Sequence, residues 1–163
     1  MSINFHDTRC QSTTYESLFG LCDDQNGTSA YIDTANQTKW IAVVNNIDEV
    51  ATTFTAIDNC IPVYRDNGEM DSCCDGMLTY TNNIVFLELK EIRTGGWIAG
   101  GIEQLKNTIL IYSKSYNILK IKRRRAFLVN KKFPKFQYGH QERMEQFKKE
   151  VGVRLIIHNT IKI

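Results

Sequence analysis

The sequence contains no apolar run long enough to cross a membrane, and residues 1–7 lack both the basic stretch and the apolar segment of a secretory signal. It also has no low-complexity tract and no repeat at the periods of solenoid proteins. With 163 residues, the chain is long enough to bury one core of ordinary size. These features predict a cytoplasmic protein with no membrane partner.

The chain also lacks a Cys-x-x-Cys pair, and its cysteines have no nearby histidine partner. Their number is odd and their spacing irregular, which indicates neither a disulfide framework nor a zinc site. We therefore expect small buried or half-buried thiols in a reducing compartment. The five residues are Cys10, Cys22, Cys60, Cys73 and Cys74.

Acidic residues are absent from 120–135, a stretch that contains eight basic side chains. Residues 1–91 carry 4 Lys and Arg against 14 Asp and Glu, and residues 92–163 carry 16 against 4. The formal net charge of +2 therefore combines one half at −10 with another at +12. A basic stretch this dense is typical of a surface that binds a phosphate backbone, although a solvated face balancing the acidic half would look similar.

The first half of the chain gives the weaker structural signals. Residues 1–35 are polar and poorly patterned, which predicts a loose or short-helical N-terminal extension before a single domain over 36–163. Apolar positions within 38–50 fit a helix, whose start Thr34 or Asn36 could cap. Residues 60–64 resemble a short strand or edge segment, because Pro62 cannot donate to a strand ladder.

The second half has clearer periodicity. Two strands, at 72–80 and 84–91, flank a tight turn and predict a hairpin. Apolar residues spaced by three and four positions predict a long amphipathic helix from Trp97 to about Leu119. A buried strand at 126–129, a helix at 141–151 and a last strand at 153–158 follow. This alternation predicts an α/β fold with a central mixed sheet covered by helices.

Charged residues interrupt the apolar hairpin at particular points. Asp75 lies on the first strand, and Glu88 and Lys90 lie two positions apart on the second, so that their side chains leave the same face. A strand this hydrophobic is expected to be buried on both faces, where an isolated charge is costly. A carboxylate pair with a metal ion between its members would remove that conflict.

The pattern of Asp75, then Glu88-Leu89-Lys90, then a long helix and a further strand resembles the PD-(D/E)XK superfamily of restriction-endonuclease-like nucleases. The resemblance covers residues 37–130 and is moderately specific, because the motif is short. It implies a restriction-endonuclease-like sheet and a metal-dependent enzyme that hydrolyses phosphodiester bonds, with DNA as the expected partner.

The resemblance also implies a role for each matching residue. Asp75 and Glu88 would bind the metal with the backbone carbonyl of Leu89, and Mg²⁺ suits such hard oxygen ligands, with Mn²⁺ as the other candidate. Lys90 would position or help deprotonate the attacking water. Gln104 matches a Gln-Leu helix pattern of some relatives, where it holds the site, although a solvent-facing glutamine would look the same. Beside Asp75, Gly76 would let backbone or phosphate approach closely.

Two further parts of the expected site are less well defined. Many relatives place a carboxylate on the first core helix, and neither Glu49 nor Glu16 can be assigned to that position. Basic residues near the motif and in the basic stretch are candidates for phosphate contacts. These nucleic-acid candidates are Arg93, Lys122, Arg123, Arg124, Arg125, Lys131 and Lys132.

Two other functions remain compatible with the same residues. A nuclease-like fold could act without cleavage, as a module that binds nucleic acid or a protein partner. A structural subunit could instead use its basic face to bind an acidic partner. A chain this small could also need a second copy to cut both DNA strands, so a homodimer is a further expectation.

Overall fold

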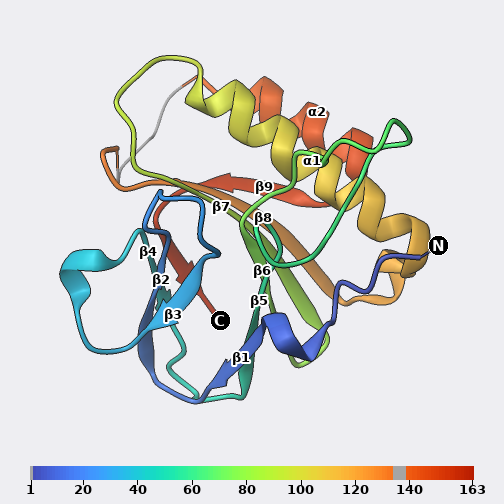
Figure 1. Cartoon of the computed structure of the whole chain (residues 1–163). Coiled ribbons are helices and arrows are strands. Elements are labelled where there is room, and N and C mark those ends of the chain that lie inside the picture. Colours follow the sequence, from blue (N-terminus) through green and yellow to red (C-terminus); the bar gives the residue numbers. More distant parts are fainter. Residues whose placement is uncertain (1, 134–138) are drawn as a thin grey trace.

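The computed structural model describes residues 2–133 and 139–163, which form two β-sheets and two α-helices (Figure 1). The larger sheet contains β1 (Gln11–Thr14), β5 (Thr52–Ala56), β6 (Gly76–Tyr80), β7 (Asn83–Lys90), β8 (Arg123–Asn130) and β9 (Arg154–Ile157). The smaller sheet contains β2 (Leu18–Cys22), β3 (Tyr31–Asp33), β4 (Ala42–Asn45) and β10 (Thr160–Lys162). The helices are α1 (Trp97–Ser115) and α2 (Gln141–Val151), and short 3-10 helices are η1 (Thr8–Cys10), η2 (Gln37–Lys39) and η3 (Ile118–Lys120).

The larger sheet is mixed, as the sequence predicts. Its order is β1-β5-β6-β7-β8-β9; the first four strands pair antiparallel, whereas β7, β8 and β9 run parallel. The β6–β7 hairpin turns through Thr81 and Asn82, both with positive φ, which confirms the predicted tight turn. The α/β class with a mixed central sheet is therefore confirmed.

Three layers make up the domain, with the larger sheet in the middle (Figure 1). Helices α1 and α2 cover one face, and the smaller sheet covers the other. Between the helices and the sheet lie Phe86, Leu105 and Leu128, whereas Phe54, Leu87 and Phe127 lie between the two sheets. Helices therefore cover only one face of the central sheet, not both, because the second sheet supplies the other apolar layer.

Burial of β7 on both faces follows from this layering. Residues 84–89 of β7 are all buried, as the apolar run in the sequence predicts. Helix α1 packs closely on the sheet through Gly101, where an added Cβ would lie 2.4 Å from a Leu128 methyl group. This close approach brings the first turns of α1 over the end of β7.

The first 35 residues differ from the prediction of a loose or short-helical extension. They contain β1, β2 and β3, and their side chains Phe5, Phe19 and Leu21 are fully buried. Strand β1 pairs with β5, and β2 with β4. These strands are short and polar outside their buried positions, which is why their period in the sequence is weak.

The predicted helix over 38–50 is also wrong. Asn36 does cap a helical turn, since its side chain accepts a hydrogen bond from Thr38 N, but that turn is only the 3-10 helix η2. Strand β4 follows, with alternating burial and β-branched residues that favour a pleated surface. The following turn leaves Ile47 81% exposed, which a buried helix face would not do.

Residues 60–64, expected as a strand or edge segment, form no named strand. The described chain has only an isolated antiparallel bridge between Tyr64 and Met70 there. Gly76, expected to admit a backbone or phosphate, instead faces the Phe54 ring, whose nearest atom would be 2.5 Å from an added Cβ. Its role is therefore packing between β6 and β5.

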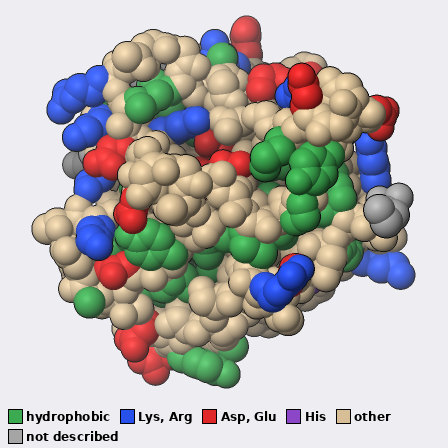
Figure 2. Space-filling model, in the orientation of Figure 1, with side chains coloured by type: hydrophobic (Ala, Val, Ile, Leu, Met, Phe, Trp, Pro, Cys, Tyr) green, Lys and Arg blue, Asp and Glu red, His purple; other side chains and the backbone are tan. Residues whose placement is uncertain are grey.

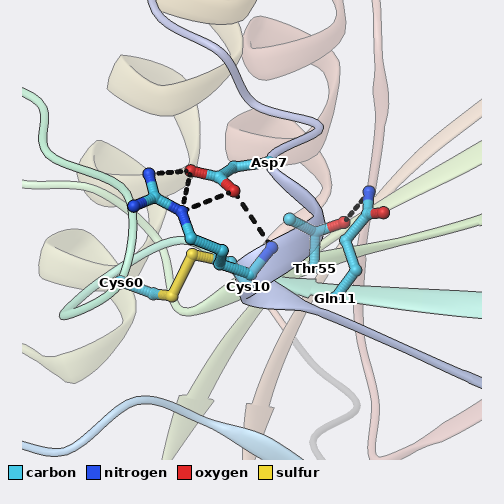
Figure 3. Close-up of a disulfide and its surroundings, with 6 residues drawn as sticks. Asp7, Cys10, Gln11, Thr55 and Cys60 are labelled. Atoms are coloured by element: carbon cyan, nitrogen blue, oxygen red, sulfur yellow. Dashed lines mark hydrogen bonds and ion pairs between the residues drawn. A yellow bond between two sulfur atoms is a disulfide. The ribbon is translucent and has the colours of Figure 1, made fainter.

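One cysteine pair departs from the expectation of free thiols. Cys10, at the end of η1, forms a disulfide with Cys60 in the segment after β5 (Figure 3). Next to it, Gln11 Nε2 donates a hydrogen bond to Thr55 Oγ1 at 3.1 Å, which joins β1 to β5. Cys22, Cys73 and Cys74 are free and buried, and burial raises the pKa of the Cys22 and Cys73 thiols to about 11.

In the described part of the chain, neither α-helix combines the length and the apolar character needed to cross a bilayer.

Candidate functional site

The β6–β7 hairpin brings the two predicted metal-binding carboxylates into one buried region. Asp75 immediately precedes β6, and Glu88 lies near the end of β7; they are 7% and 2% exposed. Asp75 Oδ2 accepts a hydrogen bond from the Leu89 N–H at 2.6 Å. The backbone next to Glu88 therefore holds the Asp75 carboxylate in place. The pairing of the hairpin thus places both acids at one end of the central sheet.

Lys90 lies beside Glu88 on the same face of β7. Its Nζ is 3.0 Å from Glu88 Oε1 and donates a hydrogen bond to Gln104 Oε1 at 2.8 Å. Gln104 Nε2 in turn donates to the Cys73 carbonyl at 3.4 Å. The structure therefore brings together all four residues that the sequence selects as catalytic, Asp75, Glu88, Lys90 and Gln104.

A buried threonine fixes the helix that carries Gln104. Thr108 Oγ1 accepts a hydrogen bond from Cys74 N at 2.7 Å and donates one to the Gln104 carbonyl at 2.8 Å. One hydroxyl thus connects α1 to the residue before Asp75. Because both contacts are buried or partly buried, they also limit the positions that Gln104 can take relative to Lys90.

Burial and mutual repulsion control the protonation of the two acids. Burial raises the pKa of Asp75 well above its usual range and the charge of Glu88 raises it further, although the Leu89 N–H opposes the change. Burial raises the pKa of Glu88 to about 7, although the ammonium of Lys90 lowers it. At neutral pH the pair therefore carries less negative charge than two ordinary carboxylates.

Two acids that the sequence reasoning missed complete the cluster. Asp23 follows β2 and Asp58 follows β5, and the charges of both raise the pKa of Glu88. Asp23 also raises the pKa of Asp75, and Asp58 N donates to the Cys74 carbonyl at 3.3 Å. Asp23 comes directly after β2 and Asp58 two residues after the end of β5, and an acid at the end of an apolar strand is the signal that could have found them.

The carboxylates considered for the first core helix lie elsewhere. Glu16 and Glu49 are exposed, and Glu49 sits in a turn with a φ of 50°. The predicted helix that would have carried Glu49 is absent from this segment. Asp23 and Asp58 are thus the additional acids next to Asp75 and Glu88, and they come from the ends of strands.

Glu88 has a buried carboxylate oxygen that a bound cation would suit. Its Oε1 contacts Lys90, but Oε2 is buried and has no hydrogen-bond partner. Within residues 2–133 and 139–163, no three His, Cys, Asp or Glu side chains are arranged closely enough to hold a metal ion. Mg²⁺ is often bound by one or two carboxylates together with several waters, so Asp75 and Glu88 are the side chains here that could hold such an ion.

An open groove beside α1 includes Gln104 in its lining. It has a volume of about 660 Å³ and is lined by Arg65, Asp71, Ser72, Gly100, Glu103, Gln104 and Asn107. Figure 2 shows acidic side chains near the centre of this face of the molecule, with a basic side chain beside them. The groove therefore gives Gln104 one side toward Lys90 and one toward solvent.

The register of β7 and β8 divides the basic stretch between the two ends of the sheet. Lys90 pairs with Asn130, so Lys131 and Lys132 follow β8 at the end that holds Glu88. Asn83 pairs with Arg123, so Arg123 begins β8 at the opposite end. Lys122 and Arg124 flank Arg123, and the predicted surface from 120 to 135 is therefore not one patch. Lys135 lies outside the described residues.

The basic residues predicted to bind nucleic acid also differ in how exposed they are and in whether they already have partners. Arg93, Lys132, Lys122 and Arg123 are exposed. Lys131 Nζ donates to the Thr38 carbonyl at 2.5 Å and lies 3.7 Å from Glu91. Arg125, however, is 3% exposed, so it is not part of the exposed basic surface that the sequence predicts.

The chain was compared with protein-family models, with curated proteins and with solved structures, and no match was found.

Proposed function

We propose that this protein is a metal-dependent nuclease that hydrolyses phosphodiester bonds in DNA, with a restriction-endonuclease-like arrangement of its central strands. The observation that supports this most directly is the pair of buried acids, Asp75 and Glu88, beside Lys90. Both carboxyl groups have raised pKa values, and one Glu88 oxygen has no partner. A divalent cation would satisfy that oxygen and stabilise the charged forms of both acids.

The chain's own residues account for binding and positioning at such a site. Asp75 and Glu88, with the Leu89 carbonyl, would hold Mg²⁺ or Mn²⁺, which when bound supplies Lewis-acid stabilisation of the phosphate and a more acidic water. Lys90 can donate a hydrogen bond to the attacking water or to a phosphate oxygen, since its ammonium carries several donors. Gln104 orients that ammonium through its 2.8 Å contact.

Basic residues at the same end of the sheet complete the proposal. Lys131, Lys132 and Arg93 follow β8 and β7 close to the acids, where they can contact the phosphates on either side of the scissile bond. A homodimer would provide a second site for the opposite strand. Gel filtration with light scattering tests this part separately from the chemistry.

The deciding experiment is cleavage of supercoiled plasmid with Mg²⁺, Mn²⁺ or EDTA. We expect metal-dependent nicking by the wild type and at least about 100-fold slower nicking by Glu88→Gln, which keeps the shape but not the charge. Glu103→Gln is the matched control, because Glu103 lies next to Gln104 yet its side chain is 69% exposed and pairs with Lys106. Equal nicking by the wild type and Glu88→Gln would refute the assignment.

One observation favours a second candidate, a module of this fold that binds nucleic acid or a protein without cleavage. Within the described residues, no third His, Cys, Asp or Glu side chain is placed to complete a metal site. Isothermal titration with Mn²⁺ distinguishes the two functions. The nuclease requires binding that Glu88→Gln weakens, whereas the binding module requires DNA affinity that neither metal nor Glu88→Gln changes.

A further inference from the structure

Three arginines lie close together at the end of the central sheet opposite Glu88. Strands β8 and β9 are parallel, and Arg125 pairs directly with Arg154. Arg123 lies two residues before Arg125, so it points to the same face of β8. Arg123 and Arg154 are exposed, whereas Arg125 is 3% exposed. We call these residues the arginine cluster.

Arg125, the buried residue of the arginine cluster, has fewer hydrogen-bond partners than its charged guanidinium requires. Arg125 Nη2 donates a hydrogen bond to Tyr80 Oη at 2.6 Å, and its guanidinium carbon lies 5.5 Å from the centre of the Phe127 ring. Its Nε, however, is buried and has no hydrogen-bond partner. A buried N–H without an acceptor is costly, and more so when it belongs to a charged group.

No acid compensates the cluster. Across residues 2–133 and 139–163, no ion pair joins Arg123, Arg125 or Arg154 to a carboxylate. Burial lowers the pKa of Arg125, and the charges of Arg123 and Arg154 lower it further, although Tyr80 opposes them. Because an arginine stays protonated in proteins, the cluster cannot relieve this repulsion by losing a proton.

We propose that the arginine cluster, with the Tyr80 hydroxyl beside it, is a binding site for a phosphate group. A guanidinium is a planar fork that donates two parallel hydrogen bonds to phosphate oxygens, and three forks around one anion neutralise each other's repulsion. The uncompensated charge and the unpartnered Nε are the features that such an anion would satisfy. The inference does not depend on the metal site or on nuclease activity.

The location separates this site from the acids. In the register of β7 and β8, Arg123 pairs with Asn83 and Arg125 pairs with Val85, so the cluster lies about 17 to 23 Å along the strands from Lys90. A bound phosphate could belong to a nucleic acid, since that spacing corresponds to about five to seven base pairs of B-form DNA. It could also be a free phosphate compound, which offers the same oxygens.

Thermal unfolding in phosphate and in chloride at equal ionic strength tests the site itself. We expect phosphate to raise the Tm of the wild type by several degrees, because it binds only the folded protein. Arg154→Gln should abolish this rise, and in chloride it should leave the Tm unchanged or higher, since it removes repulsion on Arg125. Lys149→Gln, an exposed change on α2, is the charge-matched control. An equal phosphate effect in all three proteins, or none in the wild type, would overturn the site.

A second measurement identifies the source of the phosphate. Fluorescence anisotropy with a 20-base-pair duplex, measured without metal, compares the wild type with Arg154→Gln and Lys149→Gln. Binding that weakens at least about fivefold only in Arg154→Gln, and that inorganic phosphate inhibits, assigns the site to nucleic acid. Unchanged duplex binding beside a lost phosphate-dependent Tm rise assigns it to a free phosphate compound. Both arms remain valid if the protein never cleaves DNA.

Discussion

The two ends of the central sheet bury charges of opposite sign in different ways. At the end of β7, Glu88 and Asp75 lie within a cluster of acids but have Lys90 as a local cation. At the beginning of β8, Arg125 lies among arginines, and its one side-chain hydrogen bond within the described residues is to the neutral hydroxyl of Tyr80. Both ends also leave one buried side-chain atom unpartnered, Glu88 Oε2 and Arg125 Nε.

This difference shows how the chemistry of the side chain determines what each end requires. A buried carboxyl group can take up a proton, so Glu88 and Asp75 can exist without a ligand by losing their charge. An arginine has no accessible neutral form, so its charge must be met by an anion or remain uncompensated. The acid end should therefore respond strongly to pH, and the arginine end should not.

The largest effect is expected from removing the local cation at the acid end. Lys90 lowers the pKa of Glu88, so Lys90→Met should raise that pKa above about 7 and leave less carboxylate at neutral pH. We expect plasmid nicking to fall at least about 100-fold at pH 7, with part of the loss recovered at higher pH. Initial rates measured from pH 6 to pH 9 test this.

Lys106→Met provides the control for that experiment. Lys106 lies on α1 like Gln104, but it pairs with Glu103 and Glu150 rather than with the buried acids. It should change neither the rate nor the pH profile. A loss of rate in Lys90→Met that is the same at every pH would show that Lys90 acts on the reaction without tuning Glu88.

A smaller effect concerns stability without metal. The folded protein binds the Glu88 proton more tightly than the unfolded chain, because the folded pKa is about 7 against 4.5. Glu88 therefore stabilises the fold below about pH 4.5, and this contribution is lost as the pH rises to about 7. Since glutamine does not titrate, Glu88→Gln should gain about 3 kcal/mol relative to the wild type between pH 4.5 and pH 8.

Urea unfolding in EDTA at several pH values measures that difference. The free energy of unfolding of Glu88→Gln is compared with that of the wild type at each pH, which cancels most of the contribution of other titrating groups. Glu103→Gln should show no such trend, because its parent side chain is largely exposed. A pH-independent difference for Glu88→Gln would mean that burial does not control the protonation of this acid.

The sequence predicted the acid end well because its determinants are local. Glu88 and Lys90 are two residues apart on a strand, and Asp75 is across a tight hairpin, so period and turn chemistry place all three. The helical period places Gln104 on α1, and its selection as a site residue came from the resemblance to a Gln-Leu helix pattern. By contrast, Asp23 and Asp58 reach the same site through strands β2 and β5, whose pairing is set by contacts distant in the sequence.

The arginine end was misread for the same physical reason. A run such as Lys122-Arg123-Arg124-Arg125 predicts a basic surface, but strand geometry turns alternate residues to opposite faces. Arg123 and Arg125 share one face of β8, on which Arg125 is buried, whereas Arg123, at the start of the strand, is exposed. The parallel register of β7 and β8, which moves Arg123 away from Glu88, has no signal in the run itself. The second sheet escaped prediction because its strands are three to five residues long.

The smallest predicted effect is the loss of stability in Tyr80→Phe, and its pH dependence distinguishes the arginine end of the sheet from the acid end. Tyr80→Phe removes the only oxygen that Arg125 contacts with Nη2, so a second buried N–H loses its acceptor and the free energy of unfolding should fall by about 1 kcal/mol. Because arginine does not titrate, this loss should be constant from about pH 5 to pH 9, unlike the trend at Glu88. Phosphate should reduce the loss if the anion supplies the missing acceptor. A loss that instead varies with pH as Glu88→Gln does would mean that the two ends are coupled through the sheet.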